Sequence, residues 1–388
     1  QTEKGPSNSF GVKVDYSYPI NNDSKFEAGY NGDMNTSDDI SEYLFYNLNT
    51  SQFDLNDLFS KDVQYDRNIH ALYSMYSNQF DALGVQFGLR TEYTDRLIKL
   101  ERTNEEFAID RWDLFPSAHL SFKLDQSNQF MTSYTRRIDR PRGWQLEPFL
   151  TWMDPYNVRQ GNPALQPEYI DSYELSYQRL FDKSIFSAEL YYRINNNKVE
   201  YIQSAYDENV NLQSVANVGK DYSFGSELMI NFDPLTFWNI NLMGNLYNYQ
   251  IVGELNQVKF DRESFNWNTR FNNTFNISGS TQIQFNLFYN SPTVSAQGER
   301  KGFVMTNLAL RQMFLDKQIA LTLQVRDLFG TAQHEFTSQS FDFYRYSNYS
   351  PESPMVSLNL RFNFNNYKSR ERGNRDSGGG EMEGGDDF

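Results

Sequence analysis

The chain has no cysteine, which excludes disulfide bridges and thiolate-based metal or redox sites. Its only three histidines, His70, His119 and His334, are too far apart in the sequence to suggest a zinc or catalytic centre. No stretch approaches the roughly 18 uninterrupted apolar residues of a membrane-spanning helix. Catalytic triads, phosphate-binding glycine loops and paired-carboxylate motifs are also not evident. We therefore expect no enzyme activity, no cofactor and no metal.

Positive charge is scarce as well. The net charge is −15 and the pI about 4.7, which argues against nucleic acid as a partner because phosphate binding needs a basic surface. The mean hydropathy of −0.69 does not exclude a membrane, since the apolar and polar residues of barrel strands average out. Neither a charged region nor an apolar run follows Gln1, so we expect no signal peptide here, and either a mature chain or a piece cut from a longer one.

Alternating polarity is abundant. In residues 355–364, Val356, Leu358, Leu360, Phe362 and Phe364 alternate with Ser357, Asn359, Arg361 and Asn363. Residues 265–277 repeat the pattern. Side chains of a strand alternate between its two faces, so each segment has one apolar and one polar face. Such strands fit the wall of a transmembrane β-barrel, with lipid on one side and a hydrophilic lumen on the other.

Alternation and turn residues predict about fifteen strands. They cover residues 8–18, 25–34, 65–77, 83–94, 113–124, 129–137, 170–181, 184–195, 221–232, 237–251, 264–278, 281–289, 302–315, 318–328 and 354–364.

The connections between these strands alternate between short and long. The short ones are rich in Asn, Asp, Gly, Ser and Pro, as tight turns require. The long ones cover residues 35–64, 95–112, 136–169, 196–220, 252–263, 290–301 and 329–353. Membrane barrels have this asymmetry, with short periplasmic turns and longer extracellular loops. Within 196–220, residues 199–203 and 211–218 are predicted to form a hairpin standing above the membrane.

Strand parity predicts an incomplete barrel. A long loop precedes the last strand, which therefore runs towards the periplasm, and counting back places the start of the chain on the outer side. Fifteen is odd, whereas bacterial single-chain barrels close with even numbers. We therefore predict either the C-terminal part of a larger barrel or one missed or merged strand. The barrel portion is predicted to span residues 1–367, and residues 368–388, rich in Gly and acids, to form a disordered periplasmic tail.

Several short motifs, taken together, are specific enough to indicate a protein family. They are Gly161-Asn162-Pro163 with Leu165, Pro167 and Glu168, then Glu174-Leu175-Ser176-Tyr177, Phe87-Gly88-Leu89-Arg90, Phe115-Pro116-Ser117, and Val325-Arg326-Asp327-Leu328-Phe329. This set resembles the TonB-dependent receptor-like outer-membrane proteins, and the resemblance covers nearly the whole chain.

The resemblance implies a barrel of 22 strands in a Gram-negative outer membrane, an N-terminal plug, and uptake energised through TonB. It also implies recognition of the last strand by the outer-membrane insertion machinery. This chain contains no plug, TonB box or early strands, so the fifteen strands match the last fifteen of the family's barrel.

The basic cluster of the chain is the main candidate substrate site. It consists of Arg136, Arg137, Arg140, Arg142 and the nearby Trp144. Arginine can grip an anionic substrate through bidentate hydrogen bonds. More often such residues form salt bridges among wall, plug and loops, and both interpretations stay open.

The predicted function is TonB-dependent uptake of a substrate captured by long extracellular loops. The sequence does not identify that substrate, which is a small molecule, a glycan or a peptide. One alternative is a passive porin-like or structural barrel without TonB coupling. The other is a soluble all-β binding protein.

Overall fold

The computed structural model describes residues 2–56, 60–182, 184–340 and 343–363, and these residues form an almost entirely β structure. Its one helix in this part of the chain is the 3-10 turn η1 (Gly143–Leu146). No helix in these ranges is long and apolar enough to cross a membrane. The predicted tail and Phe364 lie outside the described residues.

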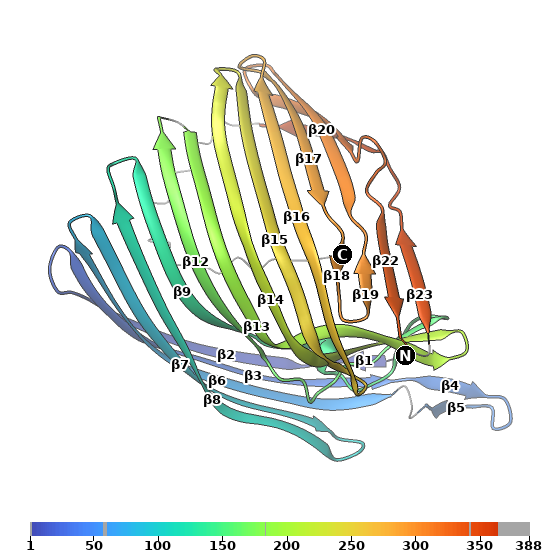
Figure 1. Ribbon diagram of the computed structural model, residues 1–388. Helices are drawn as coiled ribbons and strands as arrows, with labels where there is room; N and C mark the ends of the chain where they lie inside the picture. The colour runs from blue at the N-terminus through green and yellow to red at the C-terminus, as the bar shows by residue number, and fades with distance from the viewer. Residues whose placement is uncertain (1, 57–59, 183, 341–342, 364–388) are drawn as a thin grey trace.

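One antiparallel wall dominates the molecule (Figure 1). Three short strands of the 18-stranded main sheet, β1 (Thr2–Lys4), β10 (Thr151–Asp154) and β11 (Asn157–Arg159), lie beside the wall. The other fifteen follow one another in chain order, each paired with the next. They are β2 (Ser7–Pro19), β3 (Ser24–Glu42), β6 (Lys61–Phe80), β7 (Leu83–Leu100), β8 (Glu105–Lys123), β9 (Asn128–Asp139), β12 (Glu168–Phe181), β13 (Ser184–Asp207), β14 (Val210–Leu235), β15 (Trp238–Leu255), β16 (Val258–Asn276), β17 (Thr281–Asn290), β20 (Phe303–Phe314), β21 (Ile319–Arg326) and β24 (Met355–Phe362). The fifteen predicted strands are confirmed.

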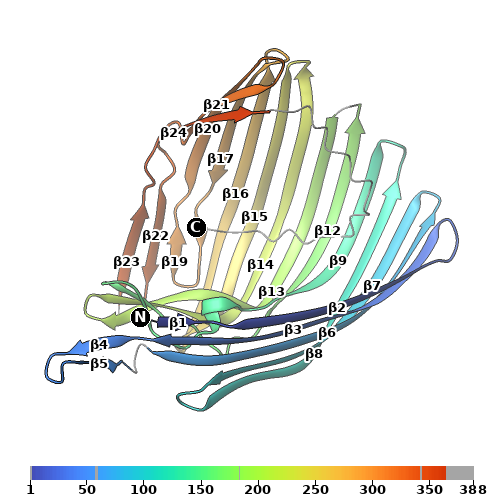
Figure 2. The ribbon, with the colours of Figure 1, turned by 180° about the vertical axis from the view of Figure 1, so that it is seen from behind.

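The wall is curved but open. Among the described residues β2 pairs only with β3, and β24 only with β21, so these two strands form its free edges (Figures 1 and 2). Every residue of β2 and β24 is exposed. The predicted all-β antiparallel barrel wall is therefore confirmed. Among the described residues, this sheet does not close on itself.

The cross-strand register keeps each face of the wall uniform. Val356, Leu358 and Leu360 of β24 lie opposite Val325, Leu323 and Leu321 of β21. Between them, Asn359 lies opposite Thr322, and Arg361 opposite Ala320. The apolar face and the polar face predicted for the last strands therefore continue across neighbouring strands, as a wall between lipid and a hydrophilic lumen requires.

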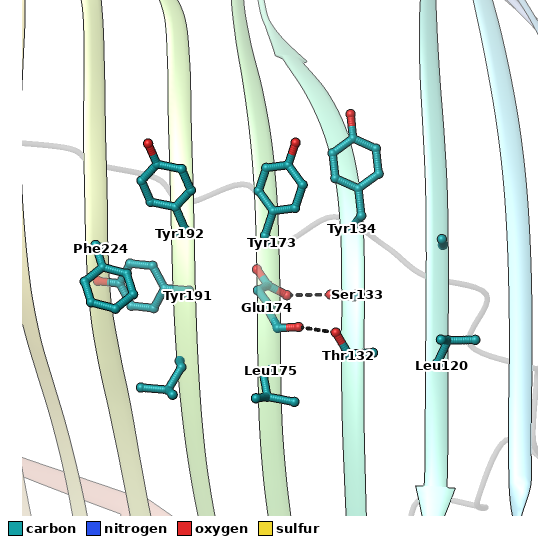
Figure 3. A pocket seen from close by; sticks show the side chains of 12 residues that line it. Leu120, Thr132, Ser133, Tyr134, Tyr173, Glu174, Leu175, Tyr191, Tyr192 and Phe224 are labelled. Atoms are coloured by element: carbon teal, nitrogen blue, oxygen red, sulfur yellow. Dashed lines mark hydrogen bonds between the residues drawn. The ribbon is translucent and has the colours of Figure 1, made fainter.

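A row of tyrosines marks the apolar face of the central strands (Figure 3). Tyr134, Tyr173 and Tyr192 lie side by side on β9, β12 and β13, with ring centroids 4.9 and 6.4 Å apart. A hollow of about 450 Å³, whose lining includes Leu120, Leu175 and Leu190, adjoins the row. An aromatic row beside exposed aliphatic side chains is typical of the interface girdle of a membrane barrel.

The two rims of the wall differ. Short turns close the rim at the upper left of Figure 1. The opposite rim carries the long hairpins and three small additions: β4–β5 (Leu44–Asn47, Gln52–Leu55), β10–β11, and the four-stranded sheet of β18 (Thr293–Val294), β19 (Gly298–Arg300), β22 (His334–Gln339) and β23 (Tyr344–Tyr349). We call this rim the loop end.

Much of what the sequence predicted as long loop is strand. Residues 95–112, 196–220 and 252–263 are mostly taken up by the paired ends of β7–β8, β13–β14 and β15–β16. Beyond the aromatic girdle neither face of a strand has to be apolar. The alternation of apolar and polar residues therefore fades, although the backbone pairing of the strands continues. The hairpin predicted within 196–220 is confirmed, with Val199 opposite Asn217 and Gln203 opposite Gln213, but it continues β13 and β14 directly.

Candidate functional site

The segment that links β9 to β12, residues 140–167, folds back onto the polar face at the loop end. Leu146 and Leu165 from this segment are buried against Ile98 of β7 and Val215 of β14. β11 adds a parallel pairing to β14, with Val158 opposite Leu212. This apolar cluster joins the β6–β8 region to the β13–β14 hairpin, so the segment is a packed part of the loop end.

Gly161 shows why the motif carries glycine at that position. A Cβ there would lie 2.1 Å from the carbonyl oxygen of Trp144, which is too close for any side chain. The next amide, of Asn162, donates to the carbonyl oxygen of Gln145 at 2.6 Å, and Gly161 donates to that of Glu147 at 2.7 Å. The glycine thus allows two segments of backbone to lie in direct contact.

Glu168, at the end of the same motif, ties the segment to the β13–β14 hairpin. Its carboxylate accepts from the Val199 amide at 2.5 Å and from Asn195 Nδ2 at 2.6 Å. Lys198 Nζ lies 3.6 Å from Glu168 and 3.8 Å from Asp221.

These groups lie beyond the tyrosine row on the loop side, and two carboxyls there have raised pKa values. Burial raises the pKa of Asp221 to about 6, an effect that the nearby Lys198 only partly offsets. Burial also raises the pKa of the Glu200 carboxyl. Three carboxylates therefore share one lysine at the base of the hairpin.

The predicted site residues do not converge on one point. Arg136 lies over the ring of Tyr169, with its guanidinium carbon 5.3 Å from the centroid, and its Nε lies 4.0 Å from Asp171. Arg140 pairs with Glu92 and donates to Thr94 Oγ1 at 3.2 Å.

The other three candidates lie on or near the 140–167 segment. Trp144 stacks on Tyr201 with centroids 5.8 Å apart, and Arg159 lies over its indole at 5.3 Å. The side chains of Arg137 and Arg142 are exposed. The structure thus places Arg136 and Arg140 in ion pairs, Trp144 in a packed loop, and two arginines in contact with solvent.

Sequence reasoning missed a group of arginines beneath the segment. A cavity of about 20 Å³ is lined by Arg67, Arg96, Arg111 and Arg140, together with Pro141, Pro167, Asp113 and three other side chains. Only Arg140 belongs to the predicted cluster. The others come from β6, β7 and β8, and only the register of the wall brings them together. Within the described ranges no group of three or more His, Asp or Glu side chains is placed to hold a metal ion.

Comparison with known proteins agrees with the architecture. The model of a family described as "Outer membrane protein beta-barrel family" matches residues 1–364. No curated protein sequence matches the chain.

Several solved structures share the fold. The siderophore receptor PiuA from Acinetobacter baumannii aligns with a TM-score of 0.65 at 11% identity, over 92% of this chain and 56% of that one. The ferric citrate transporter FecA aligns with a TM-score of 0.63 at 13% identity, over 92% and 55%. The copper transporter OprC aligns with a TM-score of 0.60 at 15% identity, over 84% and 52%. The chain therefore spans about half the length of these structures.

Proposed function

Because the chain belongs to the outer membrane protein beta-barrel family, we propose that it is the C-terminal wall of a receptor or transporter that takes up its substrate through TonB. The observation that carries this proposal is the open fifteen-stranded wall, which aligns with about half of each solved receptor or transporter. A wall with two free edges cannot enclose a lumen alone, since barrels close to satisfy the edge strands.

The proposed orientation places the loop end outside the cell and the short turns in the periplasm. The family resemblance and the difference between the two rims support it, because membrane barrels keep their longer loops outside. Residues 140–167 and the hairpin tips would then meet the substrate first. A plug inside the polar face and TonB on the periplasmic side would move it inward. Outer-membrane lipid covers the apolar face, and the insertion machinery recognises the last strand.

The substrate is a small molecule, a glycan or a peptide, and Arg136, Arg137, Arg140, Arg142 and Trp144 remain its proposed contacts. Arg137 and Arg142 are the exposed members of this set. We expect no catalytic activity, because receptors and transporters of this fold move their ligand unchanged.

The reading frame upstream of Gln1 tests the proposal. We expect a signal peptide, a TonB box, a plug and about seven further amphipathic strands, as a barrel of 22 strands needs. A frame that opens with a signal peptide directly before Gln1 would contradict energised uptake and would favour the passive, plugless barrel.

TonB coupling is tested separately in cells that carry the full-length gene. A cysteine placed in its TonB box should form a disulfide with a cysteine in TonB, and substrate should increase the yield. A yield equal to that of a scrambled TonB box would contradict coupling while leaving the barrel intact.

A further inference from the structure

Arg96 occupies an unusual position on the polar face of β7. Its cross-strand neighbour on β6 is Arg67, directly opposite. Like charges at directly opposed positions of a sheet repel each other and destabilise the pair. Arg96 is also 5% exposed, so water does little to screen the repulsion.

The carboxylates near this pair form ion pairs with arginines other than Arg96. Arg67 pairs with Asp33 at 2.9 Å, and Arg111 Nε with Asp113 at 3.1 Å. Glu92 pairs with both Arg140 and Arg90. Across the described ranges no carboxylate forms an ion pair with Arg96.

Neutral groups satisfy Arg96 only in part. Its Nη2 donates to the carbonyl oxygens of Pro163 at 3.1 Å and Leu165 at 3.4 Å. Its buried Nε has no hydrogen-bond partner in the described structure. Burial lowers the pKa of Arg96, and the effect that opposes this lowering comes from the phenol of Tyr65, not from a carboxylate. A buried charge in a native protein is paired or binds an ion, because leaving it uncompensated is costly.

The neighbouring cavity has the volume and the hydrogen-bond donors to hold an anion, which would supply the missing negative charge. Its volume of about 20 Å³ exceeds the ~10–15 Å³ that one water molecule requires, so one small ion or one oxyanion oxygen fits. Arg67, Arg96 and Arg140 line the cavity, and each has a buried Nε–H without a partner in the described residues. Asp113 also lines it, with a buried Oδ2 that has no partner there, so the four arginines of the lining face one carboxylate and keep a positive excess. Arginine donors of this kind suit chloride and carboxylate oxygens alike.

We propose that this cavity binds one small anion, held by Arg96 with Arg67, Arg111 and Arg140. The anion is either free chloride or a carboxylate group that enters from a bound ligand. Its position beneath Pro141 and Pro167 places it between β6–β8 and both ends of the 140–167 segment. The anion therefore fastens this segment to the wall. The site requires only the fold described above and does not depend on TonB coupling.

Bromide is a suitable probe because it replaces chloride and scatters X-rays anomalously. The full-length protein in detergent is titrated with bromide at constant pH and ionic strength, with gluconate as the balancing anion. We expect a saturable rise in Tm and slower hydrogen exchange across residues 140–167, because an anion that binds only the folded state stabilises it. Crystals grown in bromide should show an anomalous peak between Arg67 and Arg96. A response that is absent or does not saturate, with no such peak, would overturn the proposal.

Two variants locate the effect. Arg96→Gln should raise the half-saturating bromide concentration at least tenfold. Lys259→Gln, which removes one exposed positive charge at the tip of the β15–β16 hairpin, should leave it unchanged. Equal bromide dependence in wild type and Arg96→Gln would contradict the site. If Arg96→Gln does not fold, Arg96→Lys keeps the charge but loses the planar donors, and the same tenfold weakening is expected.

Acetate distinguishes the two sources. If acetate competes with bromide, and Arg96→Gln weakens the binding of both anions, the site accepts the carboxylate of a ligand. Binding of bromide without acetate competition identifies a site for free inorganic anion. If neither binds, the cavity holds only water and the proposal is wrong.

Discussion

The central wall and the loop end are built from the same strands but are stabilised differently. In the wall, Leu175 and Leu190 are about half exposed on the apolar face, with 52% and 51% of their surface accessible. At the loop end, Leu165 and Val158 are fully buried by protein. The wall therefore depends on lipid to cover its apolar side chains, whereas the loop end has its own packed core, as in a soluble domain.

Truncating the core of the loop end should have the largest effect. Leu165→Ala leaves a cavity in a fully packed cluster, and we expect a cost of about 2–5 kcal/mol to the local stability of residues 140–167. Hydrogen exchange of the full-length protein in micelles measures it. The wall strands should keep their protection, and an equal loss of protection in β12 to β16 would show that the two regions unfold as one unit.

Placing a charge on the lipid side tests the wall. Leu190→Arg, on the apolar face of β13 and two residues from the tyrosine row, should cost about 1–3 kcal/mol, between the roughly 2–4 kcal/mol of the bilayer midplane and the roughly 0–1 kcal/mol of the interfaces. Urea unfolding of the full-length protein in vesicles gives the value. Ser187→Arg on the polar face of the same strand is the matched control, with an expected change within about 0.5 kcal/mol. If both variants behave alike, the assignment of the two faces is wrong.

The loop end should also respond to pH, through Asp221. Its pKa of about 6 in the folded protein lies above the ordinary 3.8, so the folded state binds the proton more tightly. The stability that this proton contributes is fully present below pH 3.8 and is lost as pH rises through about 6. Relative to Asp221→Asn, wild type should therefore become more stable as the pH is lowered from 7 to 5. The gain is at most about 1.4 kcal/mol for each unit by which the folded-state pKa exceeds the unfolded one. Thermal unfolding of both proteins at the two pH values tests this, and parallel changes would contradict it.

The exposed arginines should have the smallest effect on stability. Arg137→Ala and Arg142→Ala remove exposed side chains, and we expect changes within about 0.5 kcal/mol in unfolding free energy. If these residues contact the substrate, uptake of an anionic substrate should fall in the double variant. Unchanged uptake would leave them as solvated charges.

The same contrast explains what the sequence could predict. In the wall each residue meets lipid or a polar interior, so alternation is visible in residues as far apart as Trp267 and Leu358, and all fifteen strands were found. At the loop end the partners are other segments of the chain. The facing arginines Arg67 and Arg96 are 29 positions apart in sequence, and only the register of β6 and β7 places them opposite each other. Arg140 could be predicted as a candidate because other arginines lie near it in the sequence. Its partner Glu92 lies 48 positions away and could not.

The measurement that tests the central claim most directly is a scan of β13 in the full-length protein. This chain has no cysteine of its own, so single cysteines are placed at each position from 186 to 192, after replacement of any cysteine outside the chain, and are spin-labelled in lipid vesicles. We expect oxygen accessibility to be high at Phe186, Ala188, Leu190 and Tyr192 and low at Ser187, Glu189 and Tyr191, following the two faces of the wall. Uniform accessibility along the strand, or labels that contact only water, would contradict a lipid-embedded wall.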